Sequence, residues 1–445
     1  MRPFFVDMPS VAIYTLGCRV NAFESACIAD SARLAGFDVV DWQKGADIGI
    51  VNSCALTTLA EAKTRQEIRI FARKNPQSKI AITGCYAQTE PESLKLENVK
   101  WIVGNKSKAD IVNIISQDLQ NEMQNDFCNV LLEKTSAPDL SACGNSALSD
   151  RMNLKIQDGC DNACSYCIIP RARGVPRSMD FDDIVGNAKN LVERGVREIV
   201  LTGINISKFS TTKGGLVEVI DALNEIKELV RIRIGSIEPP LLPLEAILER
   251  AKDSSHKLMP HLHISAQSFS DVVLERMRRR YKASEFLSML EKCVSLCPDI
   301  AVGGDIICGH PAETQSEFEK TKAIFASSPM AYMHVFTFSP RPKTLAYTMR
   351  DVPPVPERKA RADELREVAK EVKMRFVKSQ LGKKRKLLLE HQISSNTYFA
   401  HTDNYIPAIA IVPMSKEGMK NALVSACLKD CDARGQLLVD GVELV

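Results

Sequence analysis

Residues 153–167, NLKIQDGCDNACSYC, decide the fold of this 445-residue chain. The first five residues mix apolar and polar side chains at the spacing of a short strand. Directly after them, Cys160, Cys164 and Cys167 stand in a C-x3-C-x2-C pattern. Thiolates are soft ligands that suit iron–sulfur clusters, and this spacing lets three of them bind three irons of one cluster. The fourth iron is left without a protein ligand, which separates the pattern from four-cysteine electron carriers.

Zinc is the main alternative at this motif. Structural zinc prefers four closed ligands, and no fourth Cys or His stands nearby in the sequence. Residues 1–10 lack the features of a signal peptide, and no apolar run is long enough to cross a bilayer. We therefore expect a cytoplasmic protein without a membrane partner. In that reducing compartment the 14 cysteines are not expected to form a disulfide framework.

Downstream of the motif, the pattern of strand and helix repeats. Six such repeats predict an α/β domain built as a partial (β/α)6 barrel, with its chemistry at the carboxyl ends of the strands. A cofactor loop is expected after the first strand, where the cysteines stand. The six strand candidates within residues 151–346 are NLKIQ, REIVLTG, RIRIGSI, HLHISA, VGGDIIC and MHVFTFS.

Upstream, residues 1–148 also alternate strand-like and helix-like segments, which predicts a parallel sheet with helices on both faces. Cys18, Cys54 and Cys85 each follow the end of one predicted strand. Binding sites in such sheets form at the carboxyl ends of strands, so these cysteines could converge on one spot. The alternative is three buried core thiols, which three matching positions disfavour.

The rest of the chain divides by composition. Overall the chain is 45% hydrophobic and 25% charged, a composition that excludes a disordered or collagen-like chain. The net charge of +3 is too small to indicate a class of binding partner. Residues 116–150 read as a linker and residues 356–386 as a helix with a basic face. Residues 387–445 are predicted to form a small β-barrel. The expected domains are 9–125, 146–380 (a barrel with a helical extension) and 383–445.

The cysteine motif, with an aromatic residue before its last cysteine, resembles the radical S-adenosylmethionine superfamily. Nearly the whole chain is similar to the methylthiotransferases within it, and HTDNY (401–405) resembles their small C-terminal RNA-binding barrel, called TRAM. The ARG motif followed by Arg177-Ser178, together with SIEP (236–239), is most similar to the threonylcarbamoyladenosine tRNA branch. The similarity rests on LGCRVNAFES (16–25), VNSCALT (51–57), TGCYAQ (83–88), QDGCDNACSYCIIPRARGVPRS (157–178), RIRIGSIEP (231–239) and HLHISAQS with MRRRY (261–281).

This resemblance implies two [4Fe–4S] clusters, one on Cys18, Cys54 and Cys85 and one on Cys160, Cys164 and Cys167. It also implies S-adenosylmethionine bound at the open iron of the second cluster and cleaved to a 5′-deoxyadenosyl radical. The implied reaction converts N6-threonylcarbamoyladenosine at tRNA position 37 to its 2-methylthio derivative. The implied partners are the tRNA anticodon stem-loop and a low-potential electron donor. Alternatives are the isopentenyladenosine tRNA branch, the ribosomal protein S12 branch and a non-enzymatic iron–sulfur carrier. The sulfur source stays open, and no catalytic side chain is assigned.

Further contacts to S-adenosylmethionine are expected at predicted strand ends, although each such residue could instead belong to a turn. Five places depart from the family pattern and bear on the shape of the cofactor or substrate pocket: Phe269, Cys308, His310, Ala312 and Pro342-Lys343. His261 and His263 are interpreted as structural, and Arg278-Arg279-Arg280 as either a phosphate contact or a solvated turn. The candidate cofactor contacts are Tyr166, Thr202, Gly203, Asn205, Ser236, Glu238 and Gln267.

Overall fold

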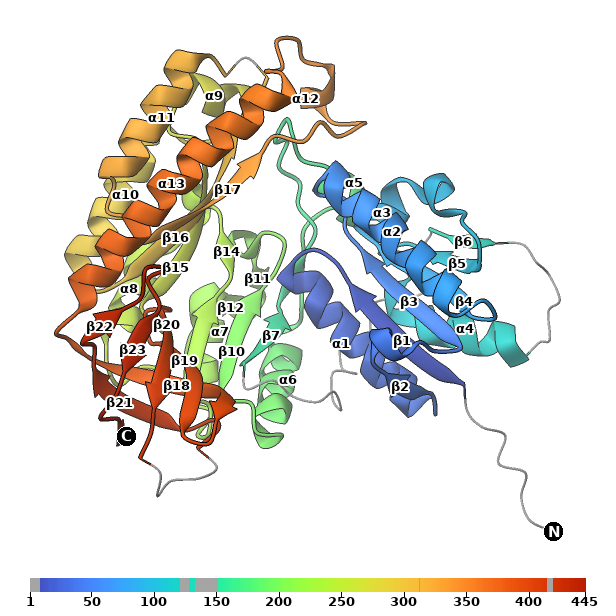
Figure 1. Ribbon diagram of the computed structural model, residues 1–445, viewed down its shortest axis with the longest axis horizontal. Helices are drawn as coiled ribbons and strands as arrows, with labels where there is room; N and C mark the ends of the chain where they lie inside the picture. Colours follow the sequence, from blue (N-terminus) through green and yellow to red (C-terminus); the bar gives the residue numbers. More distant parts are fainter. Residues whose placement is uncertain (1–8, 121–127, 133–150, 312, 414–418) are drawn as a thin grey trace. The chain divides into compact units, whose positions relative to one another are not determined.

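The computed structural model describes residues 9–120, 128–132, 151–311, 313–413 and 419–445 (Figure 1). The chain forms two compact units. Unit 1 comprises residues 1–148, 153–179 and 339–347, and unit 2 comprises residues 149–152, 180–338 and 348–445. Most of the expected linker, residues 121–127 and 133–150, lies outside the described residues.

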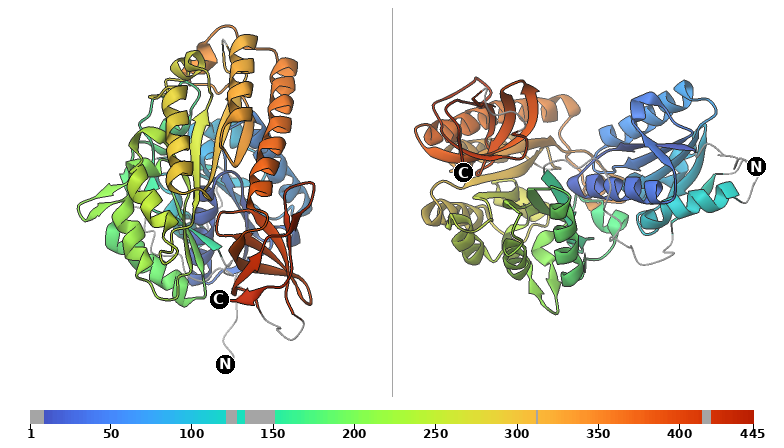
Figure 2. Two further views of the ribbon diagram at one scale, coloured as in Figure 1. Left: turned by 90° about the vertical axis from the view of Figure 1, so that its left-hand side faces the viewer. Right: turned by 90° about the horizontal axis from the view of Figure 1, so that it is seen from below.

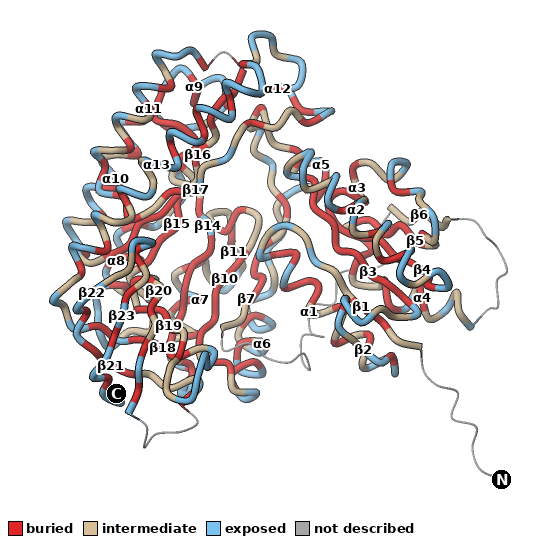
Figure 3. The backbone as a smooth tube through the Cα atoms, viewed as in Figure 1, coloured by how far each residue is buried: buried red, intermediate tan, exposed pale blue. Residues whose placement is uncertain are grey.

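Unit 1 is built on a six-stranded sheet of order β2-β1-β3-β4-β5-β6. Every neighbouring pair is parallel, which confirms the predicted sheet. All residues of β3 are buried, because helices cover both faces of the sheet (Figures 1 and 3). The elements are β1 (Ser10–Thr15), α1 (Arg19–Leu34), β2 (Asp38–Val40), β3 (Ile48–Ser53), α2 (Thr58–Lys74), β4 (Lys79–Gly84), α3 (Cys85–Thr89), β5 (Val99–Val103), α4 (Ile111–Gln120), β6 (Asn129–Leu131), β8 (Gln157–Asp158), α5 (Ile169–Arg173) and β9 (Arg177–Ser178).

All six strand segments predicted within residues 151–346 form strands, and the fold class is confirmed; residues 153–155 of the first strand, β7, are assigned to unit 1 and the other five segments to unit 2. They make a three-stranded sheet of order β13-β10-β7 and a four-stranded sheet of order β14-β15-β16-β17, with Gly235 separating β13 from β14. Helices cover the outer side of these strands (Figure 2). The elements are β7 (Arg151–Lys155), α6 (Phe181–Glu193), β10 (Glu198–Thr202), α7 (Leu216–Asn224), β13 (Arg231–Ile234), β14 (Ser236–Ile237), α8 (Leu244–Lys252), β15 (His261–Gln267), α9 (Asp271–Arg276), α10 (Ala283–Leu296), β16 (Ala301–Cys308), α11 (Gln315–Ser327) and β17 (Tyr332–Thr337).

The C-terminal part of unit 2 begins with α13 (Val355–Gln380), which packs along β17. The helix predicted to reach residue 386 therefore ends six residues earlier than expected. Gly382, with φ of +82°, turns the chain, and Lys384–Lys386 pair with β21 instead. The remaining strands form a curled sheet, a half-barrel of order β22-β23-β20-β19-β18-β21-β24 (Figure 2). They are β18 (Lys384–Ser394), β19 (Thr397–Thr402), β20 (Pro407–Ile411), β21 (Leu423–Cys427), β22 (Asp430–Cys431), β23 (Leu437–Val439) and β24 (Glu443–Leu444).

Within the described residues, no helix combines the length and the apolar character that a membrane span requires.

Candidate cluster and cofactor site

The three N-terminal cysteines follow the carboxyl ends of three adjacent strands in unit 1. β1, β3 and β4 are neighbours in the sheet, and Cys18, Cys54 and Cys85 stand just beyond them. Cys54 and Cys85 are 5% and 4% exposed, and Cys18 is half-buried. Burial, with smaller contributions from the neighbouring thiols of Cys85 and Cys18, raises the pKa of Cys54 to about 12. The sheet therefore brings the three sulfurs close enough to interact electrostatically.

The turns around these cysteines are tight. Gly17 has φ of +105°, and a Cβ at this position would lie 2.9 Å from the Cβ of Cys54. Two N–H groups donate to sulfur: the Leu56 amide to Cys54 Sγ at 3.5 Å and Asn105 Nδ2 to Cys85 Sγ at 3.6 Å. Such bonds stabilise anionic sulfur, and thiolates that hold iron–sulfur clusters are tuned by them.

The second set, Cys160, Cys164 and Cys167, lies on a loop that also belongs to unit 1. The Cys160 amide donates to the carbonyl of Gly174 at 2.9 Å, and the antiparallel pair β8–β9 closes the loop at its base. The Asn162 amide donates to Cys160 Sγ at 3.4 Å, which repeats the N–H to sulfur pattern of the first set. All three cysteines and Tyr166 are half-buried, so the loop is accessible to a ligand.

A buried charge network joins the surroundings of the two cysteine sets. The Glu24 carboxylate, on α1, accepts from Lys108 at 2.6 Å, from Lys155 at 2.7 Å and from Arg173 at 2.9 and 3.0 Å. Burial alone would raise the pKa of Glu24, but attraction to the three cations outweighs it and holds the pKa well below its ordinary value. Asp158, two residues before Cys160, pairs with Lys155 and Arg173, and they hold its pKa at about 2 against the effect of burial.

Arg173 is the centre of this network. Its Nη2 donates to Asn21 Oδ1 at 2.6 Å, and its positive charge lowers the pKa of Cys18 and Cys54 against the larger effect of burial. Three cations face two carboxylates here, so the network leaves one positive charge near the sulfurs. The sequence pattern does not predict this network, and its available signal is Lys155, a charged residue between the apolar Leu154 and Ile156.

The candidate cofactor contacts of unit 2 lie at the ends of β10, β14 and β15. Asn205 Nδ2 donates to Glu238 Oε2 at 2.8 Å, and Arg279 Nη1 lies 3.1 Å from Glu238 Oε1, so three polar groups meet there. Gln267 adopts φ of +63°, and its buried Oε1 has no hydrogen-bond partner among the described residues. An unsatisfied buried acceptor of this kind suits a bound polar ligand. Thr202 is buried, Gly203 half-buried and Ser236 exposed.

Arg279 corrects one hypothesis about the arginine run. Its side chain is 5% exposed and paired with Glu238, so this member of the run is internal and does not face a phosphate in solvent.

The departures from the family pattern are mostly internal packing. Phe269 packs edge-on against Phe286 with ring centroids 5.6 Å apart, and Cys308 and His310 are both buried. In unit 1, Lys343 donates to the carbonyl of Thr89 at 2.9 Å. Ala312 lies outside the described residues.

Two family models match the chain. The radical SAM superfamily matches residues 154–323, and the uncharacterized protein family UPF0004 matches residues 10–104. The threonylcarbamoyladenosine tRNA methylthiotransferase of Thermotoga maritima is 35% identical over 402 residues, which is 90% of this chain and 91% of the relative. The enzyme of the same name from Bacillus subtilis is 32% identical and covers 90% of each chain.

A relative with a different substrate in its name also matches. The tRNA-2-methylthio-N(6)-dimethylallyladenosine synthase of Wolbachia pipientis is 32% identical and covers 84% of this chain and 87% of its own. Among solved structures, the radical S-adenosylmethionine methyltransferase TsrM from Kitasatospora setae aligns with a TM-score of 0.54 at 11% identity, covering 73% of this chain and 72% of its own. That likeness concerns the fold alone.

Proposed function

The chain belongs to the methylthiotransferase family of radical S-adenosylmethionine enzymes, and we propose that it adds a methylthio group to C2 of N6-threonylcarbamoyladenosine at tRNA position 37, next to the anticodon. The observation that carries this proposal is the similarity to enzymes of that name at 35% and 32% identity over 90% of the chain. The dimethylallyladenosine enzyme matches a smaller share of the chain, 84%, which favours the threonylcarbamoyl substrate.

In this proposal each cysteine set holds one [4Fe–4S] cluster. The donor chemistry fits, because each set supplies three sulfurs and N–H groups point at one or more of them. Buried thiols with raised pKa values release their protons when metal binds, so cluster assembly supplies the deprotonation. When bound, the clusters and S-adenosylmethionine supply the radical and sulfur chemistry that an unactivated aromatic C–H bond requires.

The chain itself positions these groups. Arg173 and Glu24 tie the loop of the second cysteine set to α1, which begins directly after Cys18, so both sets share one rigid support. In unit 2, Glu238 is held by Asn205 and Arg279, and the buried Gln267 Oε1 is left to accept from a ligand. We assign these residues, with Thr202, Gly203, Ser236 and Tyr166, to the surroundings of S-adenosylmethionine.

The proposal includes two partners and a place of action. The anticodon loop presents unstacked bases that an enzyme can splay out and read, so the tRNA anticodon stem-loop is the substrate. Reductive cleavage of the sulfonium needs electrons at low potential, so a low-potential electron donor is the second partner. The proposed place of action is the cytoplasm, where the tRNA substrate is found.

Nucleoside mass spectrometry on total tRNA from cells lacking the gene tests this function. Loss of the methylthio group from threonylcarbamoyladenosine, restored by the wild-type gene and not by Cys160→Ala, is the expected result. Loss from isopentenyladenosine instead would keep the reaction and change the substrate. An unchanged profile, in cells with no second such enzyme, would contradict a tRNA substrate and direct the search to ribosomal protein S12.

A further inference from the structure

A second group of metal-ligating side chains lies in unit 2, whereas the six cysteines belong to unit 1. His263 on β15, Asp305 on β16 and His334 on β17 stand on three neighbouring parallel strands. Their ligand atoms lie within 4.8 Å of one another. Among the described residues, they are the one group of three or more His, Cys, Asp or Glu side chains with this arrangement. From these residues we propose that the chain binds one divalent transition-metal ion through His263 Nε2, a carboxylate oxygen of Asp305 and His334 Nδ1.

The distances support a common centre. His263 Nε2 lies 3.0 Å and His334 Nδ1 lies 3.3 Å from the same atom, Asp305 Oδ1. Ligands held at about 2.0–2.2 Å from one ion are separated by distances of this order. Two imidazoles and one carboxylate suit zinc or ferrous iron, whereas magnesium and calcium prefer oxygen ligands alone.

The sheet itself creates the grouping. Asp305 and His334 are direct partners in the β16–β17 register, and His263 pairs with Gly303, two residues before Asp305. Side chains two residues apart on a strand point to the same face, so all three project to one side. The sequence showed only H-x-H on one strand, so this convergence depended on strand pairing that the sequence did not reveal.

A hydrogen bond on the other ring nitrogen also orients one of the proposed ligands, His263. Tyr332 Oη lies 3.1 Å from His263 Nδ1 and 2.9 Å from His261 Nε2, so the second ring nitrogen of His263 is engaged. Histidines that bind metals usually have such a partner on the other nitrogen, which fixes the ring. Gly303 makes room for this contact, because a Cβ there would lie 1.9 Å from Tyr332 Cζ.

The charge of Asp305 gives a further reason. Its ion-pair partners within the described residues are His263 and His334, and no lysine or arginine of these residues forms an ion pair with it. No side chain with a permanent positive charge therefore pairs with this carboxylate in the described part of the chain. A divalent ion would supply that charge.

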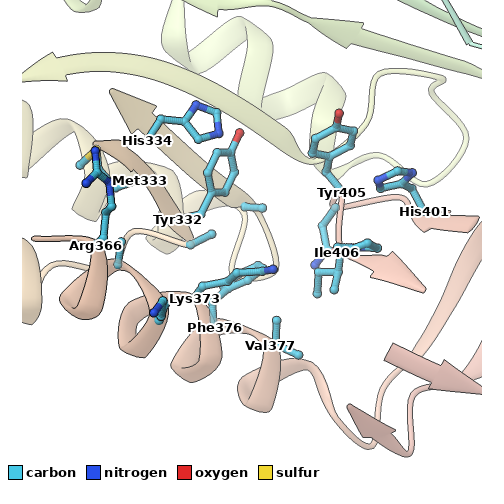
Figure 4. A pocket seen from close by; sticks show the side chains of 16 residues that line it. Tyr332, Met333, His334, Arg366, Lys373, Phe376, Val377, His401, Tyr405 and Ile406 are labelled. Carbon is cyan, nitrogen blue, oxygen red and sulfur yellow. The ribbon is translucent and has the colours of Figure 1, made fainter. Parts of the chain in front are cut away.

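The group is reachable from solvent. Tyr332 and His334 line a cavity of about 520 Å³ and project side by side from β17 (Figure 4). The side chain of His334 is 59% exposed. Three protein ligands leave coordination positions for water or an anionic oxygen ligand, as in catalytic rather than structural zinc sites. Arg366, Lys370 and Lys373 also line this cavity.

The test uses the full chain after anaerobic reconstitution, with iron and sulfide assays showing that both cysteine sets are filled. The zinc content after equilibration with micromolar Zn²⁺ and gel filtration should then be one ion per wild-type chain. His334→Ala, at an exposed position, should weaken zinc binding at least about 100-fold, and Tyr332→Phe about 10-fold to 100-fold. His391→Ala, at an exposed histidine on β18, is the matched control and should bind zinc like the wild type.

Anomalous diffraction at the zinc edge identifies the site, with a peak expected between His263, Asp305 and His334. A wild-type protein that binds no zinc under these conditions would overturn the proposal and leave a hydrogen-bonded histidine–aspartate network. Equal zinc content in the wild type and His334→Ala, at equal iron content, would overturn it as well.

Discussion

At the scale of single residues, Arg173 provides the sharpest test of how the cysteine loop is held. Its side chain is 1% exposed and pairs with Glu24 and Asp158. Replacing it by methionine leaves buried carboxylates with fewer partners, and breaking a buried pair in this way costs about 3 kcal/mol. Arg173→Met should therefore unfold at lower denaturant concentration and retain less iron. Anaerobic denaturant titration and iron assays measure both effects.

Arg177→Met is the matched control for this substitution. Arg177 lies 3.7 Å from the same Asp158 but is 49% exposed, so solvent screens the pair. Exposed ion pairs contribute about 0–1 kcal/mol, and the control should behave almost as the wild type does. Equal stability of Arg173→Met and Arg177→Met would contradict a supporting role for the network.

His310 makes a prediction about pH. Burial lowers the pKa of His310 to about 4, from an ordinary value near 6.5. As pH falls below about 6.5, the unfolded chain takes up a proton that the folded chain does not, so stability decreases until about pH 4. Between pH 7.5 and 5.5 this loss amounts to about 1 kcal/mol.

His310→Phe should remove that part of the pH dependence, because phenylalanine cannot take up a proton and its ring can keep the packing against Phe338. The measurement is the denaturation midpoint of wild type and variant at several pH values above 5. Parallel curves for the two proteins would show that His310 does not contribute.

At the scale of elements, the turn from β1 to α1 positions the first cysteine set. Gly17 combines φ of +105° with a space that Cys54 fills, so any side chain there is strained and displaces a sulfur. Gly17→Ala should therefore retain about four irons per reconstituted chain, where two filled clusters give about eight. Gly186→Ala, on the exposed face of α6 with nothing within 4 Å, should keep the full iron content and gain up to about 1 kcal/mol in stability. A Gly17→Ala protein with full iron content would contradict this account of the turn.

The elements also show how far the sequence alone could lead. The six strand segments within residues 151–346 and the parallel sheet of residues 9–132 follow from apolar runs at strand spacing, and both are confirmed. The end of α13 was predicted six residues too late, because Lys383–Lys386 continue the basic composition while Gly382 changes the backbone direction. Helix and sheet patterns cannot reveal such a change when the side chains on both sides are alike.

Side-chain partners were harder to predict than elements. The cysteines stand out in the sequence because their spacing is local or follows the strand rhythm. Glu24 and Lys155 are 131 residues apart in the sequence, yet Lys155 Nζ lies 2.7 Å from Glu24 Oε1. Nothing in a single sequence connects these two residues. The same holds for Asp305 and His263, which meet only because β15 and β16 pair. Long-range charge pairing is set by the packed fold rather than by local pattern.

At the scale of the whole molecule, both cysteine sets belong to unit 1, yet the proposed reaction uses them for different tasks. Substitutions should therefore separate the tasks. Cys160→Ala should abolish formation of 5′-deoxyadenosine, while Cys54→Ala should still cleave S-adenosylmethionine but yield no methylthio product. Two filled clusters hold about eight irons per chain. Each variant loses one of these clusters and should therefore retain about four irons.

The measurement is anaerobic turnover with the tRNA anticodon stem-loop and a chemical reductant, followed by chromatography for deoxyadenosine and mass spectrometry of the nucleosides. Arg173 contacts residues beside both cysteine sets, Asn21 near the first and Asp158 near the second. Arg173→Met should therefore lower the yields of deoxyadenosine and of the methylthio product together, unlike either cysteine variant. A Cys54→Ala enzyme that still makes the methylthio product would contradict the role of the first set. A Cys160→Ala enzyme that still forms deoxyadenosine would contradict the role of the second.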